Sequence, residues 1–123
     1  MFPGFNGDQM KVLKLRKRPE AAIQEKVINY LKIRDWFVRP LHGDAMNYGW
    51  PDLFASHNKF GPRWIEIKLP DMKGSHFTPA QLQYFPLLTA AGSGVWIMTS
   101  DSDSEYHKLF RPCNWYQYLS ILR

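Results

Sequence analysis

The chain has 123 residues, which is enough for one domain that buries about two thirds of the surface its unfolded form exposes, and too few for a second. It is 45% apolar and 22% charged, as in ordinary globular proteins, and it has no apolar run of membrane-spanning length and no signal-like segment. A single cysteine, Cys113, excludes a disulfide within the chain, so we expect an intracellular protein with no membrane partner.

The positive charge is concentrated near the N-terminus. Residues 1–18 carry +4 of the formal net charge of +5, because five basic residues there face one acid. The five are Lys11, Lys14, Arg16, Lys17 and Arg18. Such an arm can neutralise nucleic-acid phosphates, and the same charges can equally keep a terminus solvated. We expect a partly disordered basic arm over residues 1–18 and one domain over residues 19–123.

The first regular element is predicted to be a helix over about residues 19–34. Pro19 suits the first turn of a helix, and apolar residues such as Val27 and Leu31 recur at helical spacing. Glu20 lies on the same stripe at the N-terminal end. It either looks over the edge of the sheet or simply complements the positive end of the helix dipole.

Three β-rich segments follow, over residues 36–41, 51–55 and 63–69, and a turn joins the last two as a hairpin. Pro40 suits an edge or a bend in the first of them. The loop that follows the hairpin is polar and runs to His76.

A second helix is predicted after this loop, because Thr78-Pro79-Ala80-Gln81 combines a capping threonine, a first-turn proline and a glutamine that can close a capping box. Pro86 should kink that helix near residues 82–86. Residues 94–99 read as a last strand, parallel to an earlier one through the helical crossover. Ser102 and Asn114 can cap two further short helices. This order predicts a small α/β sheet with flanking helices.

Charged residues interrupt the apolar hairpin. On the strand over residues 63–69, alternation places Glu66 and Lys68 on one face and the isoleucines on the other. If the register sets Asp52 opposite Glu66, the two backbones lie about 5 Å apart, and the carboxylates can share one cation. The alternative is an ion-pair ladder on a solvated face.

Mg²⁺ and Mn²⁺ take oxygen ligands and keep several bound waters, so a protein needs to supply only a few of the ligands. The two carboxylates and the carbonyl of Ile67 would be enough. Phosphodiester hydrolysis needs such a cation, together with a positive charge that steadies the attacking hydroxide. Lys68 is placed to supply that charge.

Pro51-Asp52, then Glu66-Ile67-Lys68, resembles the signature of the PD-(D/E)XK nuclease superfamily. With the surrounding motifs, the chain looks like the VRR-Nuc family, in its compact stand-alone form found in phages and bacteria. The motifs are Glu20-Ala-Ala-Ile-Gln24, Gly49-x-Pro51-Asp52-Leu53, Ile65-Glu66-Ile67-Lys68, Thr78-Pro79-x-Gln81, Gly92 and Val95-Trp-Ile-Met98. The resemblance covers about residues 19–100 and implies a restriction-endonuclease-like mixed central sheet with flanking helices.

The resemblance also implies roles for single residues. Asp52 and Glu66 would bind the metal and Lys68 would be the catalytic lysine. Glu20 would act through water or a second metal. Gln81 would orient the lysine or the phosphate, although the capping box alone also explains it. Arg39 and Lys73 would join the basic arm in binding DNA, where scattered surface charge is the alternative.

The implied function is a metal-dependent DNA endonuclease, a homodimer that acts on branched DNA such as Holliday junctions without a small-molecule cofactor. We expect it in the cytoplasm of a bacterium or a phage-infected host cell. Two other functions stay open at this point: a DNA-binding or assembly module that does not cleave, and a restriction-type endonuclease that reads sequence.

Overall fold

The computed structural model describes residues 18–41, 49–72 and 76–122, which form a mixed α/β fold with one four-stranded sheet and three α-helices. The elements in chain order are α2 (Arg18–Ile33), β1 (Phe37–Pro40), β2 (Leu53–His57), β3 (Gly61–Ile67), α3 (Pro79–Ala90), β4 (Val95–Met98), α4 (Asp103–His107), and the 3₁₀ helices η2 (Lys108–Phe110) and η3 (Trp115–Leu122). No helix in this part of the chain is both long and apolar enough to span a membrane.

The sheet has the order β1-β2-β3-β4, with antiparallel pairing from β1 to β3 and parallel pairing of β3 with β4. The predicted hairpin and the predicted parallel strand after a helical crossover are therefore confirmed. The hairpin strands are displaced from the expected bounds, since β2 ends at His57 and β3 begins at Gly61. Only a short turn is left between them, because both strands stay paired almost to the tip.

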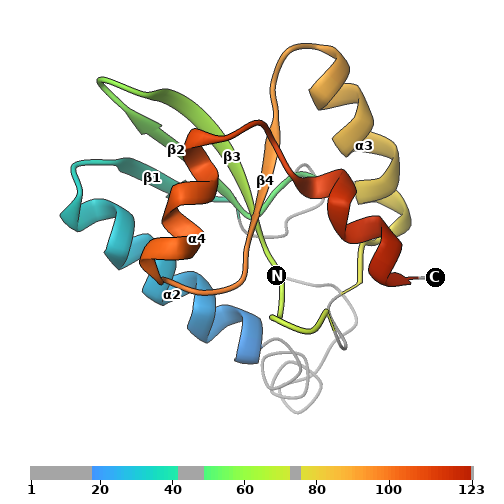
Figure 1. Ribbon diagram of the computed structural model, residues 1–123, viewed down its shortest axis with the longest axis horizontal. Coiled ribbons are helices and arrows are strands. Elements are labelled where there is room, and N and C mark those ends of the chain that lie inside the picture. Colours follow the sequence, from blue (N-terminus) through green and yellow to red (C-terminus); the bar gives the residue numbers. More distant parts are fainter. Residues whose placement is uncertain (1–17, 42–48, 73–75, 123) are drawn as a thin grey trace, which may run out of the picture.

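Each face of the sheet has its own apolar cluster. Val27 and Leu31 of α2 pack with Ile65 and Ile67 of β3 on one face, together with Leu109 of η2. On the other face Phe85 of α3, Ile97 of β4 and Trp115 of η3 pack together with Val95, Met72 and Phe77. Figure 1 shows the arrangement, with α2 and α4 to one side of β3 and β4 and with α3 and the C-terminal segment to the other. The central strands are thus covered on both faces.

Helix α2 follows its sequence pattern closely. It begins one residue before Pro19 and carries Glu20 in its first turn and Lys32 in its last, as the helix dipole favours. Val27 and Leu31 are fully buried, because their helical spacing turns both toward the sheet. The prediction of this helix is confirmed to within one residue at either end.

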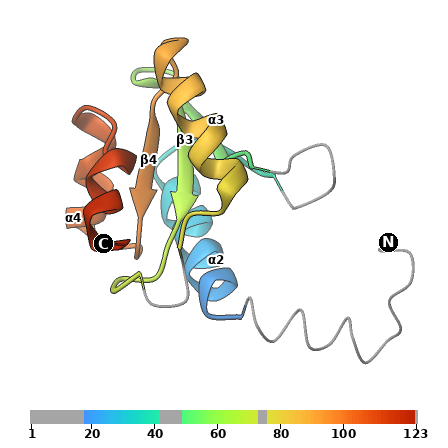
Figure 2. The same cartoon turned by 90° about the vertical axis from the view of Figure 1, so that its right-hand side faces the viewer.

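Helix α3 crosses the opposite face of the sheet (Figure 2). Its capping box is complete, since Thr78 accepts from the Gln81 backbone and the Gln81 side chain accepts from the Thr78 backbone. The helix runs without interruption past Pro86, and the kink predicted near that proline stays a prediction. The chain that leads into β2 touches α3 at Gly49, where φ is +85° and an added Cβ would lie 2.6 Å from Tyr84 Cδ2. Only glycine fits there.

The residue before η3 makes a contact that the sequence did not predict. The Asn114 carbonyl accepts from the Gln117 N–H at 3.1 Å at the start of η3, and the side-chain cap predicted there stays a prediction. The amide oxygen of the Asn114 side chain accepts from the Ile97 N–H at 2.7 Å, and its amide nitrogen donates to the Ile97 carbonyl at 3.5 Å. It is therefore bound to the outer edge of β4, where those main-chain groups face away from β3. The other cap is confirmed, since Ser102 accepts from the Glu105 backbone at the start of α4.

The fold is expected to depend strongly on Phe85. Replacing this fully buried ring with alanine leaves a cavity among the residues under α3, and we expect a loss of about 3–5 kcal/mol in the free energy of unfolding, measured by urea denaturation. Leu87→Ala on the same helix is the matched control, because Leu87 is 58% exposed, and it should change that free energy by only about 0.5 kcal/mol. Equal losses in the two variants would contradict the packing described.

Candidate functional site

The hairpin register brings the two predicted carboxylates together. Leu53 pairs with Ile65, so the same register continued by one residue sets Asp52 opposite Glu66. The Asp52 N–H donates to Glu66 Oε1 at 3.1 Å, and Asp52 Oδ2 accepts from the Ile67 N–H at 2.8 Å. Each carboxylate is therefore held by the backbone of the neighbouring strand. The prediction that the register sets them opposite one another is confirmed.

Lys68 directly follows β3 and lies beside this pair. Its Nζ is 3.2 Å from Glu66 Oε2, and the two side chains are only 4% and 3% exposed. The alternative of an ion-pair ladder on a solvated face is thus wrong, because the face that carries both charges is covered by α3 and the chain leading into it. A buried ion pair costs desolvation energy that surface charges do not incur, so stability alone is a weak reason for keeping it.

Gln81 joins the two charged residues. Its Nε2 donates to Glu66 Oε2 at 2.8 Å, while its Oε1 accepts from Lys68 Nζ at 3.2 Å and from the Thr78 N–H at 3.1 Å. The capping role and the orienting role that the sequence left open are therefore performed by the same amide group. One first-turn residue of α3 fixes both the start of the helix and the orientation of the ion pair.

The Ile67 carbonyl is directed toward the same place by the sheet pattern. Lys68 donates its N–H to Met98 of β4, so the N–H and carbonyl of Ile67, one residue earlier, point to the opposite side, toward β2. On that side the Ile67 N–H is taken by the Asp52 carboxylate, so the Ile67 main chain lies next to the acid that precedes β2.

Burial and mutual repulsion set the protonation of the two acids. Burial raises the pKa of Glu66 well above its ordinary value, and the charge of Asp52 raises it further, against the smaller opposing effects of Lys68 and Gln81. Burial also raises the pKa of Asp52, although the Ile67 N–H, Lys68 and a hydrogen bond with the Glu66 carboxyl lower it. When both acids are ionised, Lys68 and the hydrogen bonds do not fully compensate their negative charge, which is why both pKa values are raised.

Glu20 lies in the first turn of α2 and is half-buried. The negative charge of Glu20 raises the pKa of Asp52, so Glu20 interacts with the carboxylate pair in addition to complementing the helix dipole. Within residues 18–41, 49–72 and 76–122, no three His, Cys, Asp or Glu side chains lie close enough to hold a metal ion together. The predicted metal ligands Asp52, Glu66, Ile67 and Glu20 therefore stay predictions.

Most of the predicted DNA-binding residues lie outside this constellation. Lys11, Lys14, Arg16 and Lys17, as well as Lys73, are not among the described residues. Arg18 is the first residue of α2, and Arg39 is exposed on the edge strand β1. Their expected contacts with DNA stay predictions.

The sequence did not reveal the contacts that hold Lys68 from the side of the loop before α3. The His76 carbonyl accepts from Lys68 Nζ at 3.0 Å, and the Phe77 ring centroid lies 4.9 Å from the same atom. A main-chain carbonyl leaves no trace in a sequence. The aromatic ring next to the Thr78-Pro79 cap was the available signal, since cations pack against such faces.

Buried Glu105 was also missed. It is 7% exposed, and its Oε1 accepts from both the N–H and the hydroxyl of Thr99, each at 2.6 Å, where β4 ends. Its other oxygen forms an ion pair with Lys108. The pattern Ser102-x-x-Glu105 indicated only a helix start, because a capping-box acid and a buried acid look alike in sequence.

No protein-family model, no curated protein and no solved structure matches this chain.

Asp52→Asn should stabilise the fold at neutral pH when divalent cations are absent. The pKa of Asp52 is raised in the folded state, so the folded protein holds this proton more tightly than the unfolded chain does. The free energy of unfolding therefore falls as the pH rises and Asp52 ionises, a loss that an uncharged asparagine avoids. The variant should therefore unfold a few degrees above the wild type at pH 7, and the difference should shrink as the pH falls toward the ordinary carboxyl pKa of about 4.

Thermal unfolding in EDTA at a series of pH values measures this difference. The matched control is Glu25→Gln, since Glu25 is an exposed acid in α2, and it should unfold like the wild type throughout. A wild type that is the more stable protein at pH 7 would contradict the electrostatic description of the pair.

Proposed function

We propose that this protein is a metal-dependent DNA endonuclease that hydrolyses phosphodiester bonds. The observation that carries the proposal is the buried constellation of Asp52, Glu66 and Lys68, fixed by Gln81 and set at one end of the sheet. Two close carboxylates with raised pKa values and a buried lysine are costly to a fold, and such groups concentrate at functional sites.

The donor set fits a hard divalent cation such as Mg²⁺ or Mn²⁺. Both side chains are carboxylates, and the carbonyl of Ile67, whose N–H bonds Asp52, would add a third oxygen. The charge of Asp52 raises the pKa of Glu66, and a bound cation would oppose that repulsion and favour the ionised form of the pair. Charge compensation therefore favours cation binding at neutral pH.

A bound divalent cation would polarise the phosphoryl oxygens and lower the pKa of a water molecule. The protein would supply the remaining requirements. Lys68 places a positive charge next to the carboxylates, where it can stabilise the negative charge that develops on the phosphate. Gln81 holds Lys68 and Glu66 in a fixed relative orientation, and Glu20 adds negative charge from the side of α2.

The arrangement of elements supports a restriction-endonuclease-like fold as part of the proposal. A helix, a three-stranded meander, a second helix and a parallel strand occur in the order that the resemblance to VRR-Nuc nucleases implies. From that resemblance we propose branched DNA, such as four-way junctions, as the substrate. A homodimer would place two such sites on the two strands to be cut.

Lys68→Met should abolish cleavage at temperatures where the variant is still folded, and the loss of the buried partner of Glu66 should lower its unfolding temperature. We expect a rate at least about a hundredfold lower on labelled junction, flap and linear duplex DNA with Mg²⁺ or Mn²⁺, because the buried positive charge is lost but its volume is kept. Lys32→Met, at the exposed end of α2, removes the same charge elsewhere and should cut like the wild type.

Full activity of Lys68→Met, or cutting by the wild type in EDTA, would overturn the mechanism. Binding of DNA without cutting under every metal tested would instead favour a module that does not cleave. Cuts that follow a base sequence rather than a DNA shape would indicate a restriction-type enzyme.

The two functions of Gln81 can be separated by a second pair of variants. Thr78→Ala removes the side-chain acceptor of the α3 cap and should cost about 1 kcal/mol of stability with little loss of activity. Gln81→Ala additionally removes the bonds to Glu66 and Lys68, so its cleavage rate should fall about tenfold or more. Denaturation and cleavage are measured on both, and equal activities would show that Gln81 serves the cap alone.

A further inference from the structure

A pocket of about 320 Å³ lies at the C-terminal segment, away from the carboxylate pair. Its wall includes two basic side chains, Lys108 and Arg111, and two tyrosines, Tyr116 and Tyr118, along with Asn114. Leu109 packs on one face of the sheet and Trp115 on the other, and Asn114 is bound to the edge of β4 between them. The pocket therefore opens along the outer edge of the sheet.

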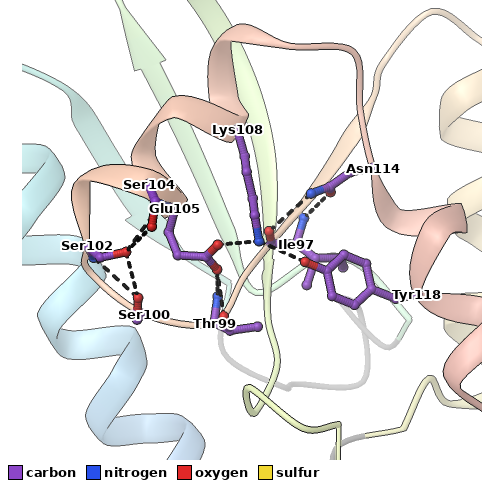
Figure 3. Close-up of polar contacts among 9 residues, drawn as sticks. All are labelled: Ile97, Thr99, Ser100, Ser102, Ser104, Glu105, Lys108, Asn114 and Tyr118. Atoms are coloured by element: carbon purple, nitrogen blue, oxygen red, sulfur yellow. Dashed lines mark hydrogen bonds and ion pairs between the residues drawn. The ribbon is translucent and has the colours of Figure 1, made fainter.

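The ammonium group of Lys108 is a fixed part of this wall. It forms an ion pair with Glu105 and donates to the Tyr118 hydroxyl at 2.8 Å, as Figure 3 shows. Glu105 is itself held by two bonds from Thr99. Burial lowers the pKa of Lys108, but the bonds to Glu105 and Tyr118 outweigh this and raise it, so the group stays charged at neutral pH.

Arg111 contributes a second cation that is available to a ligand. Its carbonyl accepts from Trp96 Nε1 at 2.9 Å and its N–H donates to the Lys108 carbonyl at 3.2 Å, so its backbone is fixed. Its guanidinium is exposed and donates no hydrogen bond to any residue that the structure describes. Tyr116 is 49% exposed, and its ring stands edge-on against Trp115, which leaves one rigid aromatic surface at the pocket.

We propose that this pocket binds one nucleotide unit of a single-stranded nucleic acid, with the phosphate on Arg111 and Lys108 and the base against Tyr116. Arginine offers a phosphate two parallel hydrogen bonds, and a lysine held beside it adds a point charge. Base stacking on tyrosine tolerates any sequence because every base has a flat face. Cations and aromatic rings together suit a nucleotide better than an acidic peptide, which offers only the anion.

The position of the pocket is consistent with a strand that also passes the proposed catalytic site. Glu66 pairs with Ile97 across β3 and β4, and Asn114 in the pocket wall is bonded to that same Ile97. Neighbouring strands lie about 4.8 Å apart, so the pocket begins about two strand spacings from the backbone of Glu66. A few nucleotides cover this separation. The inference rests on the proposed function only in choosing nucleic acid as the ligand.

Binding of a fluorescently labelled oligothymidine of ten nucleotides, followed by anisotropy in EDTA, tests the pocket without any cleavage. Arg111→Ala and Tyr116→Ala should each raise the dissociation constant about tenfold, and Arg111→Lys should fall between the wild type and Arg111→Ala. The matched controls are Lys32→Ala and Phe37→Ala, an exposed cation and an exposed ring on other surfaces, which should change it less than about twofold. Unfolding temperatures close to that of the wild type verify that all variants are folded.

Two results would overturn the inference. One is an Arg111→Ala variant that binds the oligothymidine as tightly as Lys32→Ala does. The other is a decaglutamate peptide that binds as tightly as the oligothymidine and also depends on Arg111, since the pocket would then be a general anion site.

The same measurements distinguish this inference from the proposed function. If Arg111→Ala weakens binding but no metal supports cutting, the pocket stands and the nuclease assignment fails. If the wild type cuts DNA in a Lys68-dependent manner but Arg111→Ala binds like its control, only the pocket fails.

Discussion

The interaction on which the rest of the structure depends is the burial of the Glu66 carboxylate beside Lys68. Glu66 receives hydrogen bonds from the Asp52 backbone, which leads into β2, and from Gln81 in the first turn of α3, so three separate segments must be in register for its charge to be compensated. A buried carboxylate that loses one of these partners is penalised heavily. The capping box, the hairpin register and the packing of α3 on the sheet are thus all needed to compensate the buried charge of Glu66.

The sequence was sufficient where a local rule determines the answer. The pleat of a strand has a period of two, so Glu66 and Lys68 had to share a face, and the apolar helix pattern had to turn Val27 and Leu31 toward the sheet. Thr78 and Pro79 predicted the start of α3, because threonine caps helices and proline is tolerated in the first turn. These features predicted the order of elements and the shared face of Glu66 and Lys68, whereas Gln81 was assigned to the site only through the resemblance to VRR-Nuc nucleases.

The rest depended on contacts between distant segments, which leave no local pattern. Whether the face with Glu66 was solvated or covered followed only from where α3 lies, and the hold of the His76 carbonyl on Lys68 followed from the path of a loop. In sequence Glu105 looks like an ordinary acid at the start of a helix, and only the fold brings it to Thr99 at the end of β4, from which it accepts a hydrogen bond. Pro86 lies inside α3, and the helix continues past it to Ala90.

Asn114 has a consequence for how copies of this protein can associate. An edge strand offers unpaired main-chain groups to any other strand, and this is a common route to aggregation and to sheets continued between subunits. At the edge of β4 the amide of Asn114 takes both main-chain groups of Ile97, in the middle of a strand of only four residues. A neighbouring chain cannot extend the sheet there without displacing that side chain. Pairing between copies through the β4 edge is therefore opposed, because the backbone there already has an internal partner, whereas β1 forms the other edge of the sheet.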